Sequence, residues 1–221
     1  MSAALNPQLS VLEARVLGVL VEKELTVPDI YPLSLNALTA GCNQKNNRNP
    51  VLNASDEDVQ AAIDRLKPVS LVIESSGSRV MRYSQNVGRV LKVPSEAVAL
   101  LAALWLRGPQ TAAELRAATE RLHRFADVSS VEGFLTQLGE RSLESGGPLV
   151  RLLPRGLGAR ESRWVDLLSS AAESVNVEPR REQEIGGAPA PDWRADLEQL
   201  RAELQALRER VQQLENRGPH E

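Results

Sequence analysis

At 221 residues, the chain is long enough for one large domain or two small ones. Apolar residues make up 42% and charged residues 25%, which is ordinary for a globular protein, while only 3% are aromatic, so aliphatic side chains must fill the core. The longest apolar run, 97–106, is about half the length of a membrane-spanning helix. A single cysteine excludes an internal disulfide. Residues 1–7 lack the pattern of a secretory signal, so we expect a cytoplasmic protein.

The small net charge of −3 is unevenly distributed along the chain. Residues 1–92 contain 10 Lys and Arg against 9 Asp and Glu, and residues 93–170 contain 9 against 9. Residues 171–221 contain 7 against 11, so the acidity belongs to the C-terminal part. Because neither of the first two segments is basic, tight non-specific DNA binding is disfavoured.

The first segment predicts three helices followed by a β-hairpin. Capping residues at Ser10, Ser34 and Ser55 each precede an apolar periodicity, and the last helix should stop at Pro68. Two alternating runs, 69–75 and 79–85, then predict the strands. We expect the following side chains on the inner face of the hairpin: Leu71, Ile73, Met81 and Tyr83.

The same order recurs in the second segment. We expect helices beginning at Ser95, after Thr111 and after Ser129, and strands over 149–153 and 160–165. The apolar positions of the third helices correspond at a constant offset, so Ile63 and Leu135 should both be buried. Three helices and a twisted hairpin are the plan of a winged helix, a variant of the helix-turn-helix. The predicted fold class is therefore α+β and mostly helical, with tandem winged helices over 1–92 and 93–170.

The stretch 33–45, LSLNALTAGCNQK, resembles the characteristic segment of the YceH-like family of uncharacterised bacterial proteins. The likeness extends over about three quarters of the chain. It implies a tandem winged-helix fold but supplies no catalytic residue.

The C-terminal part predicts a linker over 171–192 and a coiled-coil helix over 193–217. Apolar residues alternate at spacings of four and three, which gives about three heptads. The predicted dimerisation residues are Leu197, Leu200, Leu204, Leu207, Val211 and Leu214. The flanking charges attract each other in a parallel pairing and repel in an antiparallel one, so a parallel homodimer is favoured. The alternative is a monomeric helix packed on another surface.

Basic residues outside the third helices are the candidates for nucleic-acid contact. They lie in the polar loop 43–49 and on the two hairpins, where Arg suits phosphates and the minor groove. The candidates are Lys45, Arg48, Arg79, Arg82, Arg151, Arg155, Arg160 and Arg163. An alternative interpretation explains the hairpin arginines equally well: their charges protect the exposed edge of the hairpin from aggregation.

The third helices themselves are poor candidates for nucleic-acid contact. Three carboxylates, at 56–58, begin the first one and would repel phosphates, so a solvated, capped helix face explains them better.

The sequence predicts no catalytic residue, no metal site and no cofactor. Two histidines and one cysteine form no recognisable cluster, and Cys42 lies on an apolar helix face that is typical of a core position. The candidate partners are DNA and a protein, with no membrane. We expect a non-enzymatic, regulator-like protein that binds nucleic acid through its wings and the 43–49 loop. The alternative is an adaptor whose winged helices bind protein partners.

Overall fold

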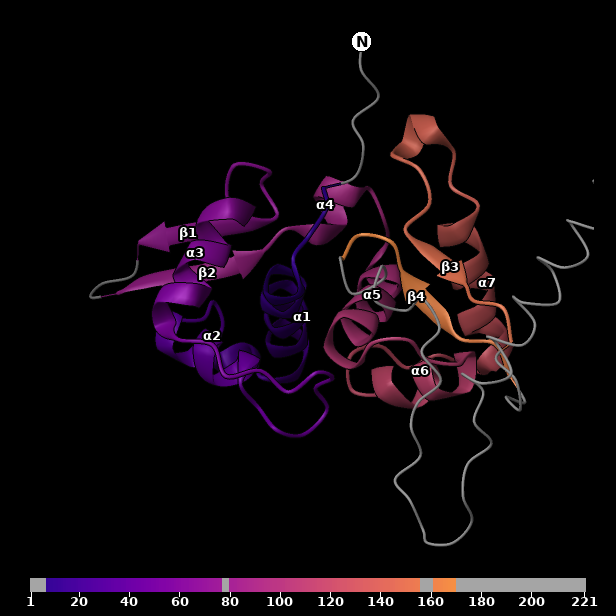
Figure 1. Ribbon diagram of the computed structural model, residues 1–221, viewed down its shortest axis with the longest axis horizontal. Helices are drawn as coiled ribbons and strands as arrows, with labels where there is room; N and C mark the ends of the chain where they lie inside the picture. The colour runs from indigo at the N-terminus through magenta and orange to yellow at the C-terminus, as the bar shows by residue number, and fades with distance from the viewer. Residues whose placement is uncertain (1–6, 77–79, 156–160, 170–221) are drawn as a thin grey trace, which may run out of the picture. The chain divides into compact units, whose positions relative to one another are not determined.

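The computed structural model describes residues 7–76, 80–155 and 161–169 (Figure 1). The chain divides into two compact units, 1–178 and 179–221, and all of the described residues belong to the first. The predicted linker, coiled coil and dimerisation residues therefore lie outside the described part. Within that part, the fold is α+β, with seven α-helices and two two-stranded antiparallel sheets.

The first three helices begin at the predicted capping residues. They are α1 (Val11–Thr26), α2 (Leu35–Cys42) and α3 (Asp56–Leu66), with a short 3₁₀ turn, η1 (Pro28–Ile30), between the first two. The side chains of Ser10, Ser34 and Ser55 each accept a hydrogen bond from a backbone N–H in the first turn, which satisfies a donor that has no partner within the helix.

The first hairpin consists of β1 (Val72–Ser76) and β2 (Met81–Gln85). β1 begins later than predicted because the chain turns after α3, where Ser70 has a φ of 60°. The prediction for the inner face was right for Leu71 and Tyr83 but wrong for Ile73 and Met81, which are 46% and 43% exposed. Leu71 precedes the strand, so Ile73 points away from the core, while Met81 lies at the distal end of the hairpin opposite Ser76.

The second half repeats this order after a short helix, α4 (Val87–Leu91). Its elements are α5 (Ser95–Arg107), α6 (Ala112–Thr119), α7 (Val128–Gly139), η2 (Leu143–Ser145), β3 (Val150–Leu152) and β4 (Trp164–Asp166). The predicted cap at Thr111 is confirmed. Helix α5 begins at Ser95, as predicted. The cap at Ser129 was misplaced, because Asp127 caps α7 by accepting from the N–H of Ser130. Ile63 and Leu135 are both completely buried, as predicted.

Each half contains one further backbone pairing that the sequence did not predict. Leu33, just before α2, exchanges two backbone hydrogen bonds with Tyr83 on β2, with N···O distances of 3.1 and 2.8 Å. Gln110, just before α6, does the same with Trp164 on β4, at 3.1 and 2.7 Å. In both halves the segment between the first and second helices therefore joins the second strand of the hairpin.

Helices α1 and α5 pack directly against each other (Figure 1). A Cβ on Gly18 of α1 would lie only 2.9 Å from Cγ of Leu106 on α5, so the two helices approach closely at this point. Every residue of 97–106 is buried, so α5 has no exposed face over this stretch. Burial on all sides follows because α5 contacts its own half on one side and α1 on the other.

The two halves are also connected through the backbone. The N–H of Leu9 donates to the carbonyl of Leu168 at 2.7 Å, and the N–H of Asn49 donates to the carbonyl of Leu106 at 2.8 Å. The residues before α1 and the α2–α3 loop thus each bond to the second half. Within the described residues, no helix is long and apolar enough to cross a membrane.

Candidate functional site

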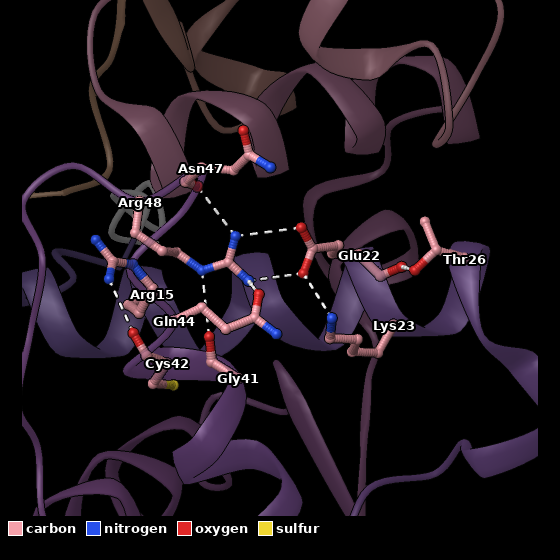
Figure 2. Close-up of polar contacts among 9 residues, drawn as sticks. All are labelled: Arg15, Glu22, Lys23, Thr26, Gly41, Cys42, Gln44, Asn47 and Arg48. Carbon is pink, nitrogen blue, oxygen red and sulfur yellow. Dashed lines mark hydrogen bonds and ion pairs between the residues drawn. The ribbon is translucent and has the colours of Figure 1, made fainter.

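Arg48 is buried and serves the structure of the α2–α3 loop. Its side chain is fully inaccessible, and Nη2 lies 2.7 Å from Oε2 of Glu22 on α1 (Figure 2). The same guanidinium also donates to the carbonyls of Gly41 and Asn47 and to the Gln44 side chain. Arg48 was predicted to contact nucleic acid, but the structure shields the group from solvent and uses its donors within the protein.

A second arginine, Arg15 of α1, holds the two ends of the same loop. Nη1 donates to the carbonyl of Cys42 at 3.0 Å and Nη2 to the carbonyl of Pro50 at 2.6 Å. Asn43 adds a pair of 2.8 Å bonds to the backbone of Ala54. The guanidinium groups of Arg15 and Arg48 thus fix the loop between α2 and α3 from its inner side. Lys45, which was predicted to contact nucleic acid, is exposed at the tip of this loop.

Beside this loop lies a polar cavity of about 300 Å³, which we call the basic cleft. Its walls come from the C-terminal part of α1, the loop residues Gln44 and Asn47, and the facing parts of α5 and α6. Its cationic lining residues are Lys23, Arg107 and Arg121, and its carboxylate is Glu22. Because Glu22 is already engaged by Arg48, as Figure 2 shows, the cleft has an excess of positive charge.

Two of these cations have no fixed partner. Within the described residues, the side chains of Arg107 and Arg121 make no hydrogen bond and no ion pair, whereas Lys23 lies 3.2 Å from Glu22. Burial lowers the pKa of the Arg107 guanidinium, the charge of Glu22 opposes that change, and nearby Arg48 lowers it further. A half-buried guanidinium beside a second one is costly without an anion. The cleft can therefore accept a negatively charged group.

Of the hairpin arginines that the structure describes, two are held by other residues and two are free. Arg163 is tied to Glu114 at 2.8 and 2.9 Å and to the carbonyl of Pro109, and Arg82 donates to the carbonyl of Pro32. Arg151 and Arg155 are exposed, and no hydrogen bond or ion pair involves their side chains within the described residues. Arg79 and Arg160 lie outside the described residues. Of the six predicted contacts within the described residues, three are plainly available: Lys45, Arg151 and Arg155.

The exposed face of α3 is acidic, as the sequence indicated. Asp56, Glu57 and Asp64 are partly or fully exposed, while Arg65 is paired with Glu13. Cys42, by contrast, is completely buried, and burial raises the pKa of its thiol to about 12. Within the described residues, no group of three or more His, Cys, Asp or Glu side chains is arranged to hold a metal ion.

Sequence reasoning missed Arg107 and Arg121. Arg107 occupies the last turn of α5, where a cation is expected for reasons of helix electrostatics alone, and Arg121 follows α6. No spacing in the sequence links them to each other or to Lys23. They share a cleft only because α1 packs against α5.

Residues 9–159 match the family described as "Protein of unknown function, DUF480". The chain belongs to this family. It is 61% identical over 182 residues to a UPF0502 protein of Leptothrix cholodnii, which covers 81% of this chain and 80% of that one. It is 57% identical over 198 residues to a UPF0502 protein of Cupriavidus necator, covering 90% and 79%. The DUF480 assignment agrees with the YceH-like resemblance that the sequence predicted.

Proposed function

We propose that this DUF480 protein is a nucleic-acid-binding protein with two tandem winged helices, and that the basic cleft and Lys45 contact the phosphate backbone. The observation that carries the proposal is the pair of unpartnered guanidiniums, Arg107 and Arg121, in a cleft bordered by the exposed loop of Lys45. This differs from the expectation from sequence, in which the hairpins made most of the contacts.

The backbone pairings at Leu33 and Gln110 support the winged-helix part of the proposal. A winged helix has a short strand between its first and second helices, and this strand pairs with the second strand of the hairpin. Both halves contain this pairing at the corresponding place. In helix-turn-helix proteins the first helix of the motif crosses the phosphate backbone, and α6, which lines the cleft, is that helix in the second half.

The charge balance supports the choice of site. Each phosphate that a protein neutralises releases condensed counterions, so contacts come from cations that are not already paired within the protein. The cleft and its rim supply three such cations: Lys45, Arg107 and Arg121. Arg48 assists indirectly, because it occupies Glu22 and leaves the cleft positive.

Fluorescence anisotropy with a labelled duplex and a labelled single strand tests the proposal. The protein should bind at about 50 mM salt, with an affinity that falls as salt rises. Replacing Lys45, Arg107 and Arg121 together with Gln should lower the log–log salt slope by about 2 to 3 on duplex DNA, or about 0.9 per phosphate contact. Circular dichroism should show that the variant remains folded.

Two controls separate the cleft from other basic surfaces. Arg89 lies exposed on α4 and outside the cleft lining, so Arg89→Gln should leave the slope unchanged. Arg151→Gln with Arg155→Gln removes the free hairpin cations. A loss of slope in this second variant, with none in the cleft variant, would assign binding to the wing instead. Absence of binding to either probe would refute the proposal.

A second candidate, a protein-binding adaptor, is favoured by one specific observation. The exposed acidic face of α3 is the face that a helix-turn-helix protein would place in a DNA groove, and carboxylates there repel phosphates. The same face suits a basic protein partner. Loss of a captured partner on replacing Asp56 and Glu57 with Gln, with unchanged nucleic-acid affinity, would support this candidate.

The C-terminal heptads support a further proposal, a parallel homodimer. Two bodies on tethers would increase avidity for a repeated site without any new contact. The residues concerned lie outside the described part, so the support comes from the sequence pattern alone.

A further inference from the structure

A second cavity, of about 240 Å³, lies between the α4–α5 connection and α7. We call it the α7 pocket. Its apolar wall is formed by Val93, Pro94, Ala97, Phe134 and Leu138. Its polar groups are Lys92, Gln137, Arg141 and Ser145. None of the residues of the basic cleft lines it, so the two cavities are separate.

The charges in the α7 pocket all have the same sign. Lys92 and Arg141 line it, and no Asp or Glu does. Neither cation has an ion-pair partner within the described residues. Two cations on one small cavity repel each other, and an anion placed between them would remove that cost.

Arg141 has a hydrogen-bonding group without a partner. One guanidinium nitrogen, Nη2, donates to the carbonyl of Ser145, but Nη1 is inaccessible to solvent and has no hydrogen-bond acceptor. Buried donors in folded proteins nearly always have a partner, so the hydrogen-bonding capacity of this guanidinium is incompletely used within the protein. Burial also lowers the pKa of this guanidinium.

The apolar wall defines the rest of the ligand. Leu138 and Ala97 are buried and line the cavity. The ring of Phe134, which also lines it, packs edge-on against the ring of Phe125, with 5.8 Å between the ring centroids. Ligand sites of this kind combine a mostly apolar surface with a few convergent polar groups. The cavity volume of about 240 Å³ lies just below the range of about 300–1,000 Å³ that is typical of pockets for drug-sized ligands, so it suits one small organic molecule.

We infer that the α7 pocket binds a small organic carboxylate, with its apolar body against Phe134 and Leu138 and its carboxylate on Arg141 and Lys92. The inference goes beyond nucleic-acid binding and does not depend on it. A free inorganic anion fits less well because it would leave the apolar wall exposed to water.

Benzoate and hexanoate are suitable probes for the full-length protein, with benzyl alcohol as the uncharged counterpart. Backbone amide NMR titration up to about 10 mM should detect either carboxylate, since even millimolar affinity is measurable in this range. The shifted resonances should belong to residues of 92–97 and 134–145. Benzyl alcohol should bind at least about tenfold more weakly, because it cannot form charge-assisted hydrogen bonds.

Variants assign the polar contacts. Arg141→Gln and, separately, Lys92→Gln should each weaken benzoate binding, the former by about tenfold or more. Lys92 is exposed, so its replacement keeps the test valid if the Arg141 variant folds poorly. Arg151→Gln removes a cation that does not line the pocket and should have no effect. The inference is overturned if neither carboxylate binds, if benzyl alcohol binds as well as benzoate, or if both pocket variants bind like the wild type.

Discussion

Arg48 and Glu22 form a two-pronged ion pair that joins the α2–α3 loop to α1. Nη2 lies 2.7 Å from Oε2 and Nη1 lies 3.2 Å from Oε1, with the Arg48 side chain fully inaccessible and that of Glu22 18% exposed (Figure 2). The pair shapes the loop that carries Lys45, and it engages the carboxylate that lines the basic cleft. Its contribution is measurable in two ways, through mutation and through pH.

Removing one member of this pair should be costly. Arg48→Ala should lower the free energy of unfolding by about 3–5 kcal/mol, because it leaves the Glu22 carboxylate in a poorly solvated place and frees the carbonyls of Gly41 and Asn47. Urea unfolding would measure it. In a double-mutant cycle with Glu22→Gln, the second substitution should cost less when Arg48 is already absent. Additive costs would contradict an energetic coupling between the two residues.

The pair should also make stability depend on pH in the acid range. Burial raises the pKa of the Glu22 carboxyl, but the hydrogen bonds and charges of Arg48 and Lys23 together outweigh burial, so the pKa in the folded protein lies below the ordinary 4.5. A carboxyl with a lowered pKa stabilises the fold above its unfolded pKa and loses that contribution as pH falls through its folded pKa. We therefore expect thermal stability to fall below about pH 4.5. Glu22→Gln should show a smaller fall over the same range.

Two helical glycines should respond to alanine in opposite directions. A Cβ on Gly41 of α2 would lie 2.5 Å from Cγ1 of the buried Val19 on α1, so Gly41→Ala should destabilise the fold by about 1–3 kcal/mol. A Cβ on Gly133 of α7 would meet nothing within 4 Å, so Gly133→Ala should stabilise it by about 0.5–1 kcal/mol. Denaturant midpoints of the two variants would check the signs.

The thiol of Cys42 should be unreactive in the folded protein. It is fully buried, and burial raises its pKa to about 12, so at pH 8 almost none of it is the nucleophilic thiolate. A colorimetric disulfide reagent should react with no thiol under native conditions and with one thiol per chain in denaturant. Rapid native labelling would show that α2 opens readily.

The C-terminal heptads should determine the oligomeric state. Leu200→Lys or Leu207→Lys would place a charge in the centre of the predicted seam and should split a dimer into monomers. Sedimentation of the intact protein, these variants and a version ending near Ser174 would measure it. An intact chain that stays monomeric at tens of micromolar would contradict self-association through this helix.

Local chemistry determined much of the secondary structure from the sequence alone. Ser10, Ser55 and Thr111 were identifiable as caps because their bonds reach only to neighbouring residues. The cap of α7 was missed by two residues because two neighbouring residues could fill that role: Asp127 is the cap, although Ser129 has the better spacing to an acidic residue. The sequence also misplaced Ile73, which was predicted to face inward. The turn after α3 determines which residue begins β1, and therefore which face of the hairpin each side chain joins.

The candidate sites depended on contacts between residues that are distant in the chain. Arg48 and Lys45 are equivalent in sequence terms, two cations in one polar loop, yet one is buried against Glu22 and the other is exposed. Arg107 and Arg121 become part of a cleft with Lys23 only through the packing of α1 on α5. Amphipathic periodicity predicts that a helix has a buried face, but it does not name the surface that covers it. Tertiary packing determines the covering surface. Here it places α1 against α5, which buries all of 97–106 and forms the cleft.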